Sequence, residues 1–96
     1  MRVFISNKAR SDLLHIYHYL EDRSPNAAEA FAERIDANFE HLVRFPFLGR
    51  ERSSLASGIR CLVVGLHLVF YTVEPDRIII VRVIDGRMDV DEEFHR

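Results

Sequence analysis

Arginine is the residue type in this sequence that is best suited to binding a charged partner. Of the thirteen basic side chains, twelve are arginine and only Lys8 is lysine. A planar guanidinium group binds carboxylates and phosphates through two parallel hydrogen bonds. An arginine-rich coding composition accounts for the count equally well. The arginines that we expect to contact a target or partner lie in the second half of the chain: Arg50, Arg52, Arg60, Arg82 and Arg87.

Arg82 is the most informative of these residues, because it lies inside the otherwise apolar run 80–84. Burying an unpaired guanidinium is prohibitively costly. One interpretation is therefore an ion pair with an acid such as Glu51 or Asp85. The other is a sheet surface that presents arginines to a polyanion or to an acidic protein.

Other chemistries lack the residues that they need. His15 and His18 could share a helix face, but no third metal ligand lies nearby, so we interpret them as solvent-facing. Cys61 lies in an apolar run and is interpreted as a buried structural cysteine. A metal-dependent nuclease needs clustered carboxylates and a lysine at the scissile phosphate, and the single lysine lies elsewhere. We expect no metal, no cofactor and no catalytic residue.

Length and composition predict one domain spanning residues 1–96. The chain is 48% hydrophobic and 29% charged, which is typical of a globular protein. Its formal net charge of −2 gives no case for nucleic-acid binding by the whole molecule, although residues 41–73 form a basic segment with four basic and one acidic side chain. No apolar run is long enough to cross a membrane and no signal peptide is recognisable, so we expect a cytoplasmic protein.

Two amphipathic helices are predicted in the first half of the chain. Ser6 is a suitable N-cap for a helix over about 7–22, and Ser24 with Pro25 begins a second helix that ends near Phe45, before Pro46. A linker of about three residues makes the pair an antiparallel hairpin. The apolar stripes that should face the core are Ala9, Leu13, Ile16, Tyr17 and Leu20 in the first helix and Ala28, Phe31, Ile35, Phe39 and Leu42 in the second.

Four strands are predicted, at residues 2–5, 59–64, 66–73 and 77–84. The last three are rich in Val, Ile, Leu and Phe and are separated by turn residues, so they should form an antiparallel meander. We therefore predict an α+β fold in which the helix hairpin packs on a mainly antiparallel four-stranded sheet, with the first strand paired to the meander.

The segment between the second helix and the meander is predicted to be a loop. Its glycines and lack of periodicity give no helix or strand signal. Its apolar side chains are hard to bury, and exposed apolar patches mark interfaces. The alternative is that the loop folds back as a lid on the core. The apolar contact candidates are Phe45, Phe47, Leu48 and Leu55.

Together these residues resemble the ParE branch of the RelE/ParE superfamily of bacterial type II toxins. The resemblance covers nearly the whole chain and implies the fold described above. It also implies a toxin that is neutralised by a cognate ParD-like antitoxin in a hetero-oligomeric complex. The segments that carry it are residues 9–17, 45–55, 58–60, 69–71 and 80–89.

The two branches of the superfamily differ in target. RelE-like members cleave mRNA on the ribosome without metal, which requires a proton-transfer group. ParE-like members act on DNA gyrase. After the last predicted strand this chain has Asp85, Gly86 and Arg87 where nucleolytic members tend to offer histidine or tyrosine, and His95 lies in a chain end that we expect to be mobile. The resemblance therefore favours a gyrase inhibitor, with a ribosome-dependent ribonuclease that uses Arg60 and Arg82 as phosphate clamps as the alternative.

Overall fold

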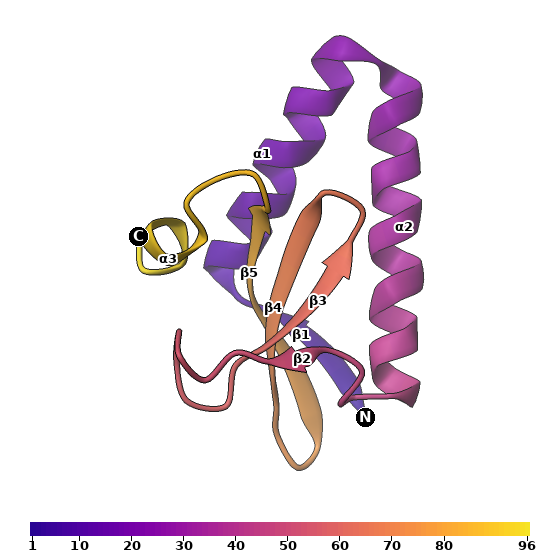
Figure 1. The fold of residues 1–96 in the computed structure, drawn as a ribbon. Helices are drawn as coiled ribbons and strands as arrows, with labels where there is room; N and C mark the ends of the chain where they lie inside the picture. The colour runs from indigo at the N-terminus through magenta and orange to yellow at the C-terminus, as the bar shows by residue number, and fades with distance from the viewer.

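Two long helices pack on one face of a five-stranded sheet in the computed structural model, which describes residues 1–96 (Figure 1). A short third helix lies near the C-terminus. The elements, in chain order, are β1 (Arg2–Ile5), α1 (Asn7–Arg23), α2 (Pro25–Arg44), β2 (Arg50–Glu51), β3 (Arg60–Val64), β4 (His67–Val73), β5 (Arg77–Asp85) and α3 (Val90–Phe94).

The helix hairpin forms as predicted, and one residue serves both of its helices. The backbone N–H of Ser24 donates to the carbonyl of Leu20 at the end of α1, while its side chain accepts from the N–H of Ala27 at the start of α2. Pro25 takes the first position of α2, where its missing N–H costs nothing. At the other end of α1, the Ser6 side chain accepts from the N–H of Ala9, as its sequence position predicted.

The strand order in the sheet is β1-β5-β4-β3-β2. β1 pairs in parallel with β5, and every other pair is antiparallel. The predicted pairing of the first strand with the meander is therefore confirmed. The predicted number of four strands is one too low, because β2 lies inside the predicted loop. Two charged residues, Arg50 and Glu51, give no strand periodicity, and only their pairing with β3 makes them a strand.

The sheet is covered on both faces. On the helix side, Phe31, Ile35 and Leu42 of α2 are buried against β3, β4 and β5, which confirms the predicted stripe; Phe39 is half-buried. The opposite face carries a smaller cluster of buried side chains, namely Leu55, Ile59, Cys61, Phe70 and Ile84. Loop 52–59 and α3 cover this second cluster, so part of the loop does act as a lid.

The C-terminal residues form α3 and pack on the sheet, so the expectation of a mobile end is wrong. The Phe94 ring lies edge-on to Phe70, with 5.2 Å between centroids. Nε2 of His95 lies 3.1 Å from the carbonyl oxygen of Leu55. Asp89 caps the first turn of α3 by accepting from the N–H of Glu92. These contacts are made across the fold, which is why the charged tail gave no sign of them.

An aspartate of α1 completes the free edge of β5. β1 ends at Ile5, opposite Ile80, while β5 runs on to Asp85 without a neighbour on that side. There the Asp12 carboxylate accepts from the N–H of Val83 at 2.9 Å. The same carboxylate forms a two-pronged ion pair with Arg82, at 2.8 Å from Nε and 3.1 Å from Nη2.

Arg82 also binds the C-terminus. Its Nη1 donates to the carbonyl oxygens of Glu93 and Phe94, and the residue is only 7% exposed. The ion-pair interpretation is therefore confirmed, but the proposed partners Glu51 and Asp85 were wrong. The partner is Asp12, because α1 crosses the edge of β5 at this point. Arg82 is not presented at an open sheet surface.

Removing the Asp12 charge should destabilise the fold. We expect Asp12→Asn to lower the free energy of unfolding by about 3 kcal/mol, because it leaves the buried Arg82 cation without a counterion. Asp22→Asn is the matched control, since Asp22 lies exposed on the same helix and takes part in no ion pair; it should change stability by less than about 0.5 kcal/mol. Urea unfolding would measure both, and equal losses would contradict the role of Asp12.

Candidate functional site

Three large apolar side chains stand exposed where α2 turns toward β2. Phe45 is 63% exposed, Phe47 66% and Leu48 53%. Their predicted exposure is confirmed, whereas the same expectation for Leu55 is wrong. Leu55 is only 6% exposed, because the chain after β2 turns back and inserts this side chain into the second cluster. We call residues 45–48 the apolar loop.

The apolar loop is anchored from below by one buried tyrosine. The Tyr71 hydroxyl accepts from the N–H of Gly49 at 2.7 Å and donates to the carbonyl of Pro46 at 2.8 Å. A Cβ at Gly49 would lie 2.6 Å from the Tyr71 ring, so only glycine allows this approach. Burial raises the pKa of Tyr71, so the phenol stays neutral and keeps the proton that it donates. The loop is therefore held in place before any partner binds.

Arg60 supports the loop from a second direction. Its guanidinium donates to the carbonyl of Gly49 and lies 4.9 Å from the centre of the Phe47 ring, within the range of a cation–π contact. Arg60 therefore shapes the loop as well as adding charge to it.

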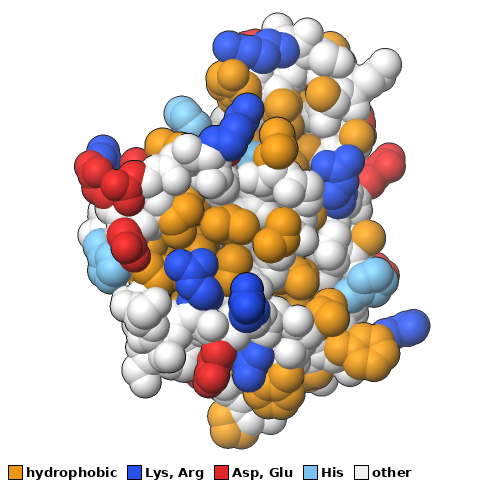
Figure 2. Space-filling model, in the orientation of Figure 1, with side chains coloured by type: hydrophobic (Ala, Val, Ile, Leu, Met, Phe, Trp, Pro, Cys, Tyr) orange, Lys and Arg blue, Asp and Glu red, His pale blue; other side chains and the backbone are white.

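Arg50 and Arg52 lie beside the loop and are free of ion pairs. Arg50 is exposed on β2 opposite Cys61, and Arg52 is half-buried; neither takes part in the six ion pairs of the structure. Figure 2 shows Lys and Arg side chains beside hydrophobic ones on the side where β2 crosses in front of the sheet. Cys61 itself is buried, and burial raises its thiol pKa despite the charge of Arg52, as expected for a structural cysteine.

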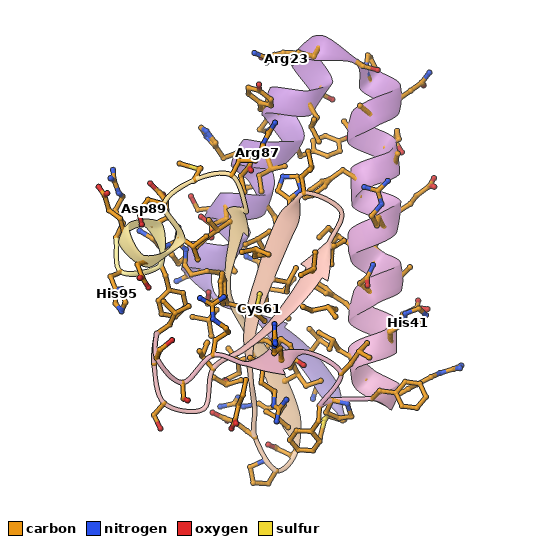
Figure 3. The ribbon with its side chains drawn as sticks, in the orientation of Figure 1. Arg23, His41, Cys61, Arg87, Asp89 and His95 are labelled. Carbon is orange, nitrogen blue, oxygen red and sulfur yellow. The ribbon has the colours of Figure 1, made fainter.

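Arg87 lies elsewhere, at a groove of about 520 Å³ between α1 and the ends of β4 and β5. Figure 3 shows it beside α1, away from Cys61 and β2. Three half-exposed apolar side chains, Tyr19, Leu66 and Met88, come to this groove from three different segments. The predicted arginines thus fall into two groups: Arg50, Arg52 and Arg60 near the apolar loop, and Arg82 and Arg87 at the groove.

Two histidines line the same groove, and sequence reasoning missed their convergence. His15 comes from α1 and His67 from β4. Only the packing of α1 across the sheet brings them together, although the cross-strand position of His67 opposite Asp85 follows from the β4–β5 hairpin. Burial lowers the pKa of His67, whose ring lies edge-on to Phe31. No group of three or more His, Cys, Asp or Glu side chains is placed to hold a metal ion.

Both arginines of the groove are paired with carboxylates. Arg82 is bound to Asp12, and Arg87 lies 2.7 Å from Asp85. Hydrogen bonds from Arg87 lower the pKa of Asp85 from 3.8 to about 2. Each of the two arginines in the groove is therefore already paired with a carboxylate of the same chain.

The Asp85–Arg87 pair gives a specific pH dependence. Because the folded pKa of Asp85 is depressed, its stabilising effect should be present above about pH 3.8 and be lost as the pH falls toward 2. In Arg87→Ala, the pKa of Asp85 should return toward 3.8, as measured by NMR titration of the carboxyl carbon. The control is Arg77→Ala, which removes an arginine paired with Glu74 instead and should leave Asp85 near 2. An unchanged pKa in Arg87→Ala would contradict the assignment.

Comparison with known proteins identifies the family. Residues 3–90 match the family model described as the ParE toxin of the type II toxin–antitoxin system parDE. The chain is 33% identical over 90 residues to "Toxin ParE3" of Caulobacter vibrioides, covering 93% of this chain and 90% of that protein. Its fold matches a solved structure titled "Chromosomal ParDE TA system from P. aeruginosa", with a TM-score of 0.75 at 24% identity over 88% of this chain and 95% of the other.

These matches agree with the observed architecture, in which an N-terminal strand and a helix hairpin precede an antiparallel meander. None of the helices qualifies as a membrane span; α2 has the length, at 20 residues, but is too polar. The match to the family model spans nearly the whole chain and includes the apolar loop, Arg60 and the Asp12–Arg82 pair. The chain belongs to the ParE toxin family of type II toxin–antitoxin systems.

Proposed function

We propose that this chain inhibits DNA gyrase by direct protein–protein contact, and that a cognate ParD-like antitoxin neutralises it by covering the same surface. The observation that carries the proposal is the anchored apolar loop with Phe45, Phe47 and Leu48 exposed beside the unpaired Arg50 and Arg52. Aromatic residues and arginine are enriched in protein interfaces, and exposed apolar clusters mark them. The proposed site of action is the cytoplasm.

A partner-binding role is supported by the way the loop is built. Tyr71 and Arg60 hold it through hydrogen bonds to backbone groups of Pro46 and Gly49, so its position does not require burial of the exposed side chains. An ordered loop loses little conformational entropy on binding, which favours affinity. The family description names a parDE system, and we extend that partnership to this chain.

A ribosome-dependent mRNA ribonuclease is the second candidate, and the observation that favours it is the presence of His15 and His67 in the groove. Cleavage of RNA also needs a cation to stabilise the phosphorane. Arg82 and Arg87 are each neutralised by a carboxylate at this groove, and the unpaired Arg50 and Arg52 are on β2 and the loop that follows it. We therefore favour inhibition without a catalytic residue.

The antitoxin contact is tested by truncating the loop. Phe47→Ala and Leu48→Ala should each weaken binding of the antitoxin encoded beside the toxin gene by about 2 kcal/mol, as measured by titration calorimetry, because both remove exposed apolar anchors. Val63→Ala is the matched control, since Val63 is equally exposed on β3, and it should leave the affinity unchanged. Equal losses in all three variants, or no binding by the wild type, would contradict the proposal.

The target is tested with two parallel assays. The purified wild-type protein should inhibit gyrase supercoiling, and the Phe47→Ala/Leu48→Ala variant should lose most of that inhibition. Neither protein should cleave mRNA on ribosomes. Specific mRNA cleavage with supercoiling untouched would overturn the choice in favour of the ribonuclease.

A further inference from the structure

Every charged side chain that lines the groove between α1 and the ends of β4 and β5 is already paired within the chain. We call this groove the α1–β5 groove. Five of its lining residues carry a formal charge, and each of them takes part in an ion pair. The α1–β5 groove therefore offers no unpaired charge to a ligand of either sign. The pairs are Asp12–Arg82, Asp85–Arg87 and Glu93–Arg96.

The α1–β5 groove offers apolar surface and a few neutral polar groups instead. Seven of its fifteen lining residues are hydrophobic, and its volume of about 520 Å³ is typical of a ligand pocket. The other polar side chains of the lining carry a hydroxyl or an imidazole, which can donate or accept a hydrogen bond. Burial lowers the pKa of His67, so its ring is neutral at pH 7. These polar residues are Ser11, His15 and His67.

The walls of the α1–β5 groove are held in place by contacts within the chain. The N–H of Gly86 donates to the carbonyl of Leu66 at 2.8 Å and ties the β3–β4 turn to the end of β5. A Cβ at Gly86 would lie 3.2 Å from the same oxygen, so glycine suits this close approach. On the α1 side, the Arg23 guanidinium lies 3.6 Å from the centre of the Tyr19 ring, and Arg23 itself does not line the groove. The groove is therefore formed before any ligand binds.

The rim of the α1–β5 groove is suited to a protein ligand. Tyr19 is 50% exposed, Leu66 59% and Met88 50%. A free small molecule inside the groove would leave the outer parts of these side chains in water. A protein segment that inserts one side chain would cover the rim as well, which is how the central residues of protein interfaces are shielded from solvent. Aromatic residues and methionine are also enriched in such interfaces.

We propose that the α1–β5 groove binds one tryptophan or tyrosine side chain that a partner protein presents. The ring would contact the apolar lining, and its N–H or O–H group would pair with a hydroxyl or imidazole of the groove. A carboxylate or an ammonium group would lose its hydration and find no unpaired counterion. This surface is separate from the apolar loop, so the proposal does not depend on gyrase or on the antitoxin.

The test uses capped, uncharged pentapeptides as probes, each with one variable residue between serine and glycine. NMR titration of the full-length protein follows the methyl groups of Leu66 and Met88. We expect the tryptophan peptide to shift both signals and to leave those of Leu48 in the apolar loop unchanged. Peptides with glutamate or lysine should bind about tenfold more weakly or worse, both signs alike. A tyrosine peptide should bind about threefold more tightly than a phenylalanine peptide, which lacks only the hydroxyl.

Protein variants locate the contact. Leu66→Ala should lower the affinity for the tryptophan peptide about fivefold, because it truncates a side chain of the rim. Leu48→Ala is the matched control, since Leu48 is equally apolar, 53% exposed and outside the groove, and it should leave the affinity unchanged. This control also separates the proposal from the proposed function of the apolar loop. No methyl shifts with the tryptophan peptide, tighter binding of a charged peptide, or equal losses in both variants would overturn the proposal.

Arg87→Ala tests the charge argument directly. It leaves the Asp85 carboxylate without its partner at the groove, so the lysine peptide should bind this variant about fivefold more tightly than it binds the wild type, and the glutamate peptide should not gain. The Arg87 side chain is 69% exposed, so its truncation leaves the core intact. Arg77→Ala breaks the pair with Glu74 outside the groove and should change neither affinity. An Arg87→Ala protein that still rejects both charges alike would contradict the argument.

Discussion

The bidentate ion pair between Asp12 and Arg82 is the contact on which the arrangement of this small fold depends. It joins α1 to β5, and the same guanidinium holds the carbonyl groups at the end of α3. The Asp12 carboxylate also takes the place of a missing strand by accepting from the N–H of Val83. A buried charge pair gives modest net stability, but losing one partner is costly, so the pair favours the arrangement in which α1, β5 and α3 meet at Arg82.

The long elements could be predicted from sequence because their signals are local. Ser6 and Ser24 cap the helices, apolar stripes give their faces, and turn residues separate the strands. β2 and α3 could not be predicted, since two residues carry no periodicity and a charged tail becomes a helix only against Phe70 and Arg82. The ion-pair partner of Arg82 could not be predicted either, because Asp12 lies 70 residues away in the chain and only the fold brings the two together.

The candidate site was predictable in part. Exposure of the apolar loop followed from its position directly after the end of α2, in a segment that contains Pro46 and has no periodicity. Leu55 is also apolar but is buried, because the chain after β2 folds back over the sheet and places this side chain in the second cluster. The net charge of −2 was a poor guide, since it averages an arginine-bearing side near β2 and exposed carboxylates on α2. Net charge therefore says little about the local charge that a partner meets on either side of the molecule.

The anchoring of the apolar loop through its backbone has a consequence for how such a protein evolves. Tyr71 and Gly49 fix the path of the chain, while Phe45, Phe47 and Leu48 are exposed, with Phe47 also in contact with the Arg60 guanidinium. Exchanging Phe45 or Leu48 therefore alters recognition and leaves the backbone anchors of the loop in place. Exchanging Tyr71 or Gly49 removes an anchor of the loop backbone and should change the affinity for every partner that binds the loop. Specificity and framework are thus carried by separate residues, which lets a lineage acquire a new partner through single substitutions while the fold stays intact.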